Sequence, residues 1–559
     1  MPSVSLDKET VLKMIGKKLG DSELAERLPM HGLFLEGITE DKINVEIFPN
    51  RPDMLSEEGF ARAISGFLGV KTGLEKFAVK KSDYAVTVDA RIAKIDRKYI
   101  GIAVMKGLKF DNEFIISSMQ LQDKLATTQG RRRKKVAMGV YDLDKIKFPL
   151  AYTMVGENEK FIPMGHDREI KVSELAEEHK RGKEYSHLIE GWKDFPAYKD
   201  ADGKILCVIP ITQADFTKVT EKTKDVMIEV TGTDWRAVQQ IMNILVTNWS
   251  GRGAELYEAK IKYPFETPEG KNVVCPILKT AKMELDVNYA NKLLGLNLKA
   301  AEAAKLLERM RYGAVAKKDR IEVEVPAYRT DVLHPFDLVE DIAIAYGYEN
   351  FKHEIPRVST IGEEAPRSLV FRKIAEVCSG LGLLECCTLH LSNERILNDN
   401  MLLKNKNFVK TINAVNIEYD IVRNSLLPML LKTLSENTHN EYPQKLFEMG
   451  EIYDEEKGEP VERNSLSIVS CHGRAEFTEM KSLIEALFSS IGEKVSFREA
   501  KHNSFISGRC AAVLADGKQI GIMGEIHPQV LANFKLEMPA AGFECGIDWL
   551  VGKYNKKRE

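Results

Sequence analysis

Hydrophobic positions recur along the chain with periods that predict a mixture of helices and strands. Helical spacing predicts one helix over Lys8–Leu19 and another after Ser56, and alternation over Ile43–Ile47 predicts a half-buried strand between them. Ser56 and the glutamates that follow it are typical of a helix start. We therefore expect an α/β domain over residues 1–80.

A second readable pattern covers residues 269–352. Helical spacing is found over Asn288–Leu294 and Lys299–Met310, and Ile321–Val325 alternates as a strand. Pro335 suits the first turn of a further helix. This order of elements predicts a small winged-helix-like domain.

The remaining boundaries follow from prolines and glycines. Residues 263–270 contain two prolines and a glycine and predict a linker that closes a large region, 81–268. A final α/β region covers 353–559. Within it, five leucines have helical spacing and predict a core or subunit-interface helix: Leu426, Leu427, Leu430, Leu431 and Leu434.

Composition narrows the class of protein. The 559 residues are 44% hydrophobic and 29% charged, which is typical of a globular protein with several domains. With 80 basic and 83 acidic residues, the net charge of −3 excludes a uniformly cationic surface, so RNA would be met only by local patches. The densest basic run is either a solvated loop or a phosphate contact: Arg131, Arg132, Arg133, Lys134 and Lys135.

Cysteine usage and hydropathy indicate a cytoplasmic protein. The eight cysteines form no CxxC pair, so we expect small buried thiols in a reducing compartment. The N-terminus has no basic-then-apolar signal segment, and no stretch approaches the roughly 18 apolar residues of a membrane span.

A cluster of acids is the main candidate for metal chemistry. Asp337, Glu340 and Asp341 are spaced to share one face of the helix that begins at Pro335, and Asp331 precedes them by about one turn. Converging carboxylates repel one another unless a hard divalent cation binds them. The alternative is separate acids that favour the start of a helix through its dipole.

The segment that contains these acids, Tyr328–Tyr348, resembles the metal-binding segment of phenylalanyl-tRNA synthetase beta subunits. The resemblance assigns Asp331, Asp337, Glu340 and Asp341 to Mg²⁺ at the interface with an alpha subunit. Residues 50–63 resemble the N-terminal motif of the family, and residues 446–451 and 524–528 resemble its C-terminal catalytic-like domain. Residues 121–125 and 136–144 resemble the second region of the archaeal and eukaryotic members. Many of those members have histidine where this chain has Tyr141.

The resemblance implies an α+β multidomain fold with an editing domain, a winged-helix-like domain and a degenerate class II synthetase-like antiparallel-sheet domain. The last region has no glycine-rich arginine motif after Arg423, and the chain has no GxxxxGK[ST] loop. ATP is therefore expected to act as a substrate on the alpha subunit. The implied assembly is an alpha2beta2 heterotetramer that acts on tRNA(Phe).

The resemblance also implies an editing site in residues 81–268, signalled by residues 227–234. Alternation places Glu229, Thr231 and Thr233 on one strand face, where a carboxylate accepts a hydrogen bond from a tyrosine hydroxyl. The alternative is an exposed polar strand face. Gln213 replaces an asparagine that is frequent in the family, and no Ser-His-Asp or Cys-His set is recognisable. An ordered water or the substrate itself would then assist hydrolysis of the ester.

Three functions remain open from the sequence. The first is a synthetase beta subunit that removes tyrosine from mischarged tRNA(Phe). The second is a structural and tRNA-binding subunit whose editing site has decayed. The third is a stand-alone metal-dependent hydrolase that uses the acidic cluster.

Overall fold

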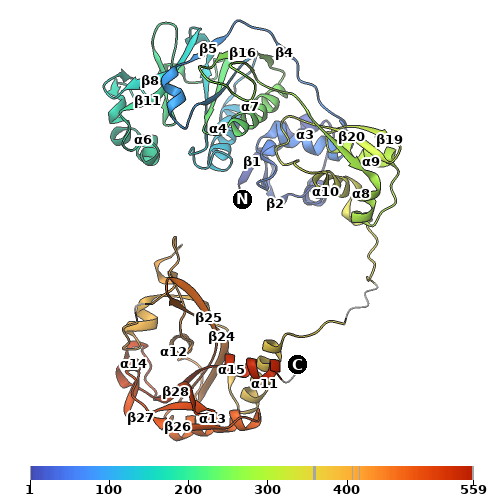
Figure 1. Ribbon diagram of the computed structural model, residues 1–559. Helices are drawn as coiled ribbons and strands as arrows, with labels where there is room; N and C mark the ends of the chain where they lie inside the picture. Colours follow the sequence, from blue (N-terminus) through green and yellow to red (C-terminus); the bar gives the residue numbers. More distant parts are fainter. Residues whose placement is uncertain (1, 357–360, 406, 415, 557–559) are drawn as a thin grey trace. The chain divides into compact units, whose positions relative to one another are not determined.

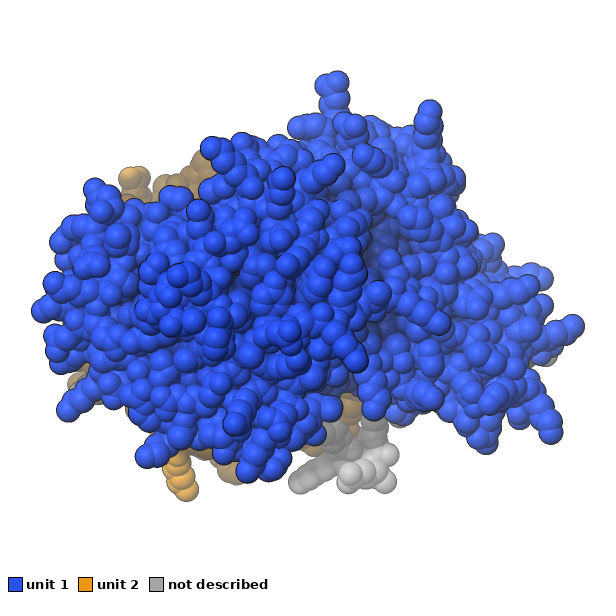
Figure 2. Space-filling model, turned by 90° about the horizontal axis from the view of Figure 1, so that it is seen from above, with its two compact units in different colours: residues 1–355 blue, residues 356–559 orange. Residues whose placement is uncertain are grey.

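The computed structural model describes residues 2–356, 361–405, 407–414 and 416–556. The chain forms two compact units, which Figure 1 traces as ribbons and Figure 2 colours separately. Unit 1 comprises residues 1–355 and unit 2 comprises residues 356–559. Each unit has hydrophobic clusters of its own.

Unit 1 begins with a three-stranded antiparallel sheet in the order β1-β3-β2. The elements of this part are β1 (Ser3–Asp7), α1 (Lys8–Ile15), α2 (Asp21–Met30), β2 (Phe34–Ile38), β3 (Lys42–Glu46) and α3 (Glu57–Phe67). The helix expected from Lys8 ends early because Gly16 adopts a left-handed conformation, with φ 80°, at its C-cap. Ser56 caps α3 as expected, since its hydroxyl accepts from the Gly59 amide.

A five-stranded sheet forms the centre of unit 1. Its strand order is β4 (Val79–Lys80), β15 (Glu255–Tyr257), β6 (Tyr99–Lys106), β14 (Val226–Gly232) and β7 (Val136–Asp142). Helix α7 (Trp235–Ser250) packs on β6 and β14, and α4 (Asn112–Thr127) contacts β7. Every residue of β14 is buried, so the polar side chains of this strand lie inside the domain.

A seven-stranded sheet completes the middle of unit 1. Its strand order is β13 (Thr212–Gln213), β12 (Ile205–Val208), β11 (Asp194–Lys199), β8 (Leu150–Gly156), β5 (Ala85–Val88), β16 (Ala259–Lys262) and β17 (Asn272–Cys275). Strands β16 and β17 pair antiparallel. Residues 263–270, expected as a linker, therefore form the loop of a hairpin.

The last part of unit 1 has the predicted order of elements. They are β18 (Ala281–Asp286), α8 (Val287–Leu294), α9 (Ala300–Arg309), β19 (Gly313–Lys317), β20 (Arg320–Val325) and α10 (Pro335–Tyr346). Alternate residues of β20 are buried, as its sequence predicts, and Pro335 is the first residue of α10. The strand order is β18-β20-β19.

Unit 2 is built on a seven-stranded sheet that is antiparallel except between β21 and β24. Its order is β21 (Leu384–Glu385), β24 (Gln444–Glu456), β25 (Glu459–Cys471), β29 (Ala540–Gly546), β28 (Lys518–Ile526), β27 (Phe505–Ala515) and β26 (Val495–Glu499). One hydrophobic cluster includes side chains from α11 (Pro366–Gly380) and α13 (Phe477–Ser490), and another includes those of α12 (Leu427–Glu436). The five leucines around α12 are buried, so they are core residues.

Candidate functional site

A cavity of 360 Å³ in the middle of unit 1 brings together several of the predicted site residues. Its walls come from α4, β7, β14 and the segment 207–213 that spans the turn between β12 and β13. Much of the lining is apolar: Met119, Ala126, Ala137, Met138, Val208, Ile209, Pro210 and Ile211. Polar and charged side chains share the lining, including Gln120, Gln122, Asp123, Arg181 and Thr212. A concave site that combines apolar walls with polar groups is typical of small-molecule binding.

Glu229 and Tyr141 form a buried hydrogen-bonded pair in the wall of this cavity. The Tyr141 hydroxyl donates to Glu229 Oε2 at 3.2 Å, and each residue is 1% exposed. Glu229 Oε1 is buried and has no hydrogen-bond partner among the described residues. The pair therefore leaves one carboxyl oxygen available to a ligand.

Burial also changes the charge of Glu229. It raises the pKa of Glu229 to about 8, and the hydrogen bond from Tyr141 opposes this rise. At neutral pH the free chain thus holds Glu229 mainly as a neutral acid, whereas the sequence suggested a carboxylate. A neutral acid still accepts a hydrogen bond through its carbonyl oxygen and donates one through its hydroxyl.

Gly139 makes room for this pair. It lies directly opposite Glu229 in the pairing of β7 with β14. A Cβ atom at Gly139 would lie 2.7 Å from the Tyr141 hydroxyl oxygen, closer than packed side chains allow. A glycine is therefore required at this position if Tyr141 is to reach Glu229.

Gln213 and Arg133 also line the cavity. Arg133 donates to the carbonyl oxygens of Pro210 at 2.9 Å and Ile211 at 2.8 Å, and its guanidinium lies over the Tyr185 ring. Arg133 thus fastens the segment that leads to Gln213. The structure brings Gln213 and Glu229 to one cavity, as the sequence predicted for a shared site.

The two predicted threonines occupy different positions. Thr231 is fully buried and is not among the lining residues, but its hydroxyl interacts with the Glu229 carboxyl group and opposes the rise in the pKa of Glu229. Thr233 follows the end of β14 and is exposed. The Thr233 hydroxyl is 3.5 Å from the Lys135 carbonyl oxygen. The alternative of an exposed polar strand face is wrong for Glu229 and Thr231, because the adjacent strands and α7 enclose β14.

The basic run divides into two groups. Arg131, Arg132 and Lys134 are exposed, whereas Arg133 points to the cavity and Lys135 lies 3.7 Å from Asp234. The three arginines have positive φ angles of 50°, 50° and 63°, a conformation that non-glycine residues adopt rarely. Arg97, which the sequence analysis did not single out, donates to the carbonyl oxygens of Arg133 and Lys134 and so holds this turn.

The four predicted metal ligands line one cavity of 310 Å³. Arg329 lies among them and pairs with Asp331 at 2.8 Å and with Asp341 at 2.7 Å. Asp337 accepts from the amides of Leu333 and His334 and so caps α10. Burial and then the neighbouring carboxylates raise the pKa of Glu340.

The chemical type of these four residues suits a divalent cation, but their present contacts do not. All four are carboxylates, which hard divalent ions prefer. As they lie, however, Arg329 already supplies a positive charge to two of them, and Asp337 is engaged with the backbone. In the described ranges, no set of three or more His, Cys, Asp or Glu side chains forms a group that could hold a metal ion.

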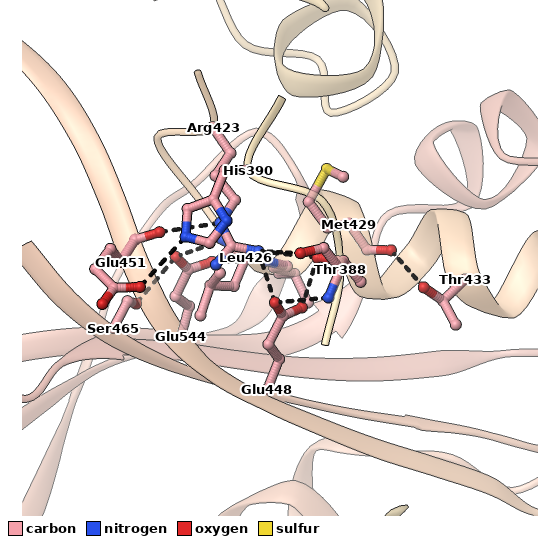
Figure 3. A network of polar contacts seen from close by, with 11 residues as sticks. Thr388, His390, Arg423, Leu426, Met429, Thr433, Glu448, Glu451, Ser465 and Glu544 are labelled. Carbon is pink, nitrogen blue, oxygen red and sulfur yellow. Dashed lines mark hydrogen bonds and ion pairs between the residues drawn. The ribbon is translucent and has the colours of Figure 1, made fainter. Parts of the chain in front are cut away.

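Unit 2 contains a buried polar network on β24 and on the segment before α12 (Figure 3). Arg423 donates to Glu448 at 2.6 Å and to the Glu451 carbonyl oxygen at 3.0 Å, and Arg423 and Glu448 are each 1% exposed. A Cβ atom at Gly450 would lie 2.5 Å from the Arg423 guanidinium. Arg423 is thus enclosed by residues of unit 2 and contributes to the packing of that unit.

Comparison with known protein families matches three parts of the chain. The phenylalanyl tRNA synthetase beta chain CLM domain matches residues 352–547, the tRNA synthetase B5 domain matches 283–348, and the B3/4 domain matches 124–248. The acidic cluster lies within the B5 match. The Glu229 cavity is lined mainly by residues of the B3/4 match.

Relatives of known name match nearly the whole chain. The phenylalanine–tRNA ligase beta subunit of Archaeoglobus fulgidus is 38% identical over 98% of each chain. That of Methanocaldococcus jannaschii is 38% identical over 98% of this chain and all of its own. A crystal structure of an N-terminal fragment of the Pyrococcus horikoshii phenylalanyl-tRNA synthetase beta-subunit is 35% identical, with a TM-score of 0.59, and covers 62% of this chain and 99% of the fragment.

These matches define a subunit of an aminoacyl-tRNA ligase. The chain belongs to the family of phenylalanine–tRNA ligase beta subunits. The resemblance inferred from the sequence is therefore confirmed.

All eight cysteines are free, and six of them are buried. Among the described residues, no helix has the length and apolar character needed to cross a bilayer.

Proposed function

We propose that this chain removes tyrosine from mischarged tRNA(Phe) in the Glu229 cavity, while a partner alpha subunit attaches phenylalanine at the expense of ATP. The observation that supports this most is Glu229 Oε1, a buried acceptor without a hydrogen-bond partner among the described residues, in the wall of a cavity that has both apolar and polar lining residues. The ring of a tyrosine side chain would contact the apolar part of the lining, and its hydroxyl would hydrogen-bond to Glu229 Oε1. Phenylalanine lacks the hydroxyl and would leave Glu229 Oε1 without a hydrogen-bond partner.

The chemical problem explains why such a site is useful. A hydrophobic pocket rejects an isostere that adds a hydroxyl by only about 10²-fold, so a synthetic site alone admits some tyrosine. A second site that hydrogen-bonds the hydroxyl selects the wrong product instead of the right one. Glu229, with Tyr141 fixing one of its oxygens, provides that selection.

The cavity lining indicates how the ester is cleaved. Cys207 is the thiol that lines the cavity, and burial raises its pKa far above the ordinary value, so it is not a nucleophile at neutral pH. We therefore infer that water attacks the ester carbonyl carbon, assisted by the substrate's terminal ribose hydroxyl. Gln213 is positioned on the cavity wall to orient the ester or that water.

A deacylation assay tests this function. We expect the complex of this chain with its alpha subunit to hydrolyse tyrosyl-tRNA(Phe), and Glu229→Ala to slow that hydrolysis by about tenfold or more, because a buried hydrogen bond to the hydroxyl is lost. The matched control is Glu221→Ala, an exposed acid of the same region. Equal rates in wild type and Glu229→Ala would refute the site, and no hydrolysis by wild type would favour a decayed one.

The rest of the molecule is assigned by the same proposal. We assign residues 1–80 to an N-terminal domain, 81–268 to the editing domain, 269–352 to a winged-helix-like domain and 353–559 to a class II-like domain without synthetic activity. Strands β4 and β17 pair with β15 and β16, so both belong with the editing domain, and its two boundaries move outward by a few residues. We propose an alpha2beta2 assembly in the cytoplasm, with Mg²⁺ at Asp331, Asp337, Glu340 and Asp341 once Arg329 has released part of the cluster. The exposed Arg131, Arg132 and Lys134 are available to contact tRNA phosphates.

A further inference from the structure

A second cavity in unit 1 shares no lining residue with the Glu229 cavity and is larger, at 590 Å³. We call it the junction cavity, because its walls come from α1, α3, the end of α7 and the segments that follow α3, β6 and α9. Six cationic side chains line it: Lys13, Arg62, Lys71, Lys109, Arg252 and Arg311. The acids in the lining are Glu58, Glu75 and Asp111, so positive charge is in excess.

Two of the three arginines are held in place by aromatic rings. The Arg62 guanidinium lies 3.7 Å from the centre of the Tyr328 ring, and it donates to Asn248 Oδ1 at 2.8 Å. The Arg252 guanidinium lies 3.9 Å from the centre of the Phe114 ring and pairs with Glu58. These contacts fix the orientation of each guanidinium before any ligand arrives.

Arg311 is fixed differently and is the most buried of the three. It donates to the Lys71 carbonyl oxygen at 2.8 Å and to Glu75 at 3.1 Å, and it is 8% exposed. Its Nε atom is buried without a partner among the described residues, as is Glu58 Oε2. The cavity wall therefore has both an unused donor and an unused acceptor, which a ligand would satisfy.

The three lysines of the cavity lining differ from the arginines in their exposure. Lys13, Lys71 and Lys109 are exposed, and none of them makes an ion pair with another described residue. Their ammonium groups therefore add positive charge that is not held in an ion pair within the described part of the chain. An anion in the cavity would thus lie near exposed ammonium groups as well as guanidinium groups that are held in place by their contacts.

From this arrangement we propose that the junction cavity binds a phosphate group of a ligand that also has a hydroxyl or amino donor. Guanidinium groups bind phosphate oxygens through paired N–H donors, and the ammonium groups add charge. Glu58 Oε2 accepts from the ligand's own donor. A nucleotide has both features, and its phosphate is either free in solution or part of an RNA strand. This site does not depend on the hydrolysis of tyrosyl esters.

The test uses the full-length chain at low ionic strength, where exposed charges are least screened. Calorimetric titrations use inorganic pyrophosphate and ADP, and filter binding uses a tRNA(Phe) transcript. The test variant combines Lys13→Gln, Lys71→Gln and Lys109→Gln, all at exposed positions that leave the fold intact. The matched control combines Lys18→Gln, Lys94→Gln and Lys282→Gln, which change the net charge equally and lie outside the cavity.

We expect saturable binding by wild type, binding weakened about tenfold in the test variant, and binding within about twofold of wild type in the control. Arg311→Lys keeps the charge but loses the planar donors, and we expect it to weaken binding as well. If the test variant binds the transcript more weakly than the control variant does, but pyrophosphate and ADP bind equally to both, then the bound phosphate belongs to RNA. That result supports the proposed site. Equal losses in both triple variants, or no saturable binding of any probe, would overturn the proposal.

Discussion

Glu229 lies in an environment that its residue type does not suggest. A glutamate in a strand ordinarily faces solvent, but here the strand is buried on both sides and the acid is 1% exposed. Its sequence neighbours Ile228 and Val230 are apolar, and this pattern indicates a buried strand. The pairing with Tyr141 had no such signal, because the two residues are 88 positions apart.

The raised pKa of Glu229 predicts a pH dependence of stability. The ordinary value of 4.5 becomes about 8 in the folded chain, so between these values the folded state holds a proton that the unfolded state releases. The contribution of Glu229 is therefore intact below about pH 4.5 and is lost as pH rises through about 8.

Glu229→Gln removes this titration. We expect its melting temperature to rise relative to that of wild type as pH increases from 5 to 8.5 in roughly unit steps, and to level off above that range. Melting of Glu221→Gln, at an exposed acid, serves as the control. Parallel curves for wild type and Glu229→Gln would show that Glu229 titrates normally.

At the scale of elements, the register of β7 against β14 determines the site. It places Gly139 opposite Glu229, and Tyr141 extends across the glycine to reach the carboxyl group. A shift of one residue would send these side chains to the other face of the sheet.

Gly139→Ala tests that geometry. The added methyl group would displace the Tyr141 hydroxyl, so we expect a loss of about 1–3 kcal/mol of stability and slower hydrolysis of tyrosyl-tRNA(Phe). Gly156→Ala is the matched control, because its Cβ atom would meet nothing within 4 Å. Unchanged stability and hydrolysis in Gly139→Ala would mean that Tyr141 does not need its present position.

Local elements were predictable from the sequence where a short-range cause existed. The Ser56 cap, Pro335 at the start of α10 and the alternation of β20 all follow from neighbours within a few residues. Long-range pairing was not predictable. Thr233 was expected on the strand face but follows the end of the strand. Residues 263–270 were expected to be a linker but form the loop between the paired strands β16 and β17, because strand pairing is not encoded in local spacing.

The acidic cluster shows the same limit. Helical spacing correctly suggested that its members lie close together, and they line one cavity. The placement of Arg329 between Asp331 and Asp341 was not apparent, although Arg329 is only two residues from Asp331. The repulsion that seemed to require a metal is already reduced by this arginine.

At the scale of the whole molecule, assembly tests the proposed magnesium site. We expect Asp337→Asn combined with Glu340→Gln to lower bound Mg²⁺ and to weaken association with the alpha subunit, because two of four oxygen donors lose their charge. The measurements are metal analysis and sedimentation of the purified complex.

The control for assembly is Asp319→Asn combined with Glu308→Gln. This variant loses the same number of negative charges, but neither residue lines the cavity. Normal metal content and normal tetramers in the Asp337 and Glu340 variant would mean that Arg329 alone neutralises the cluster. Family membership would be unaffected by that outcome.

Recognition of one hydroxyl by Glu229 is best tested by binding without chemistry. We would measure the affinity of the full complex for amide-linked tyrosyl-adenosine and phenylalanyl-adenosine, neither of which can be hydrolysed as an ester. We expect the tyrosyl compound to bind about tenfold tighter or more, and Glu229→Ala to abolish that difference. Equal affinities in wild type, or a preference for the tyrosyl compound that survives in Glu229→Ala, would contradict the assignment.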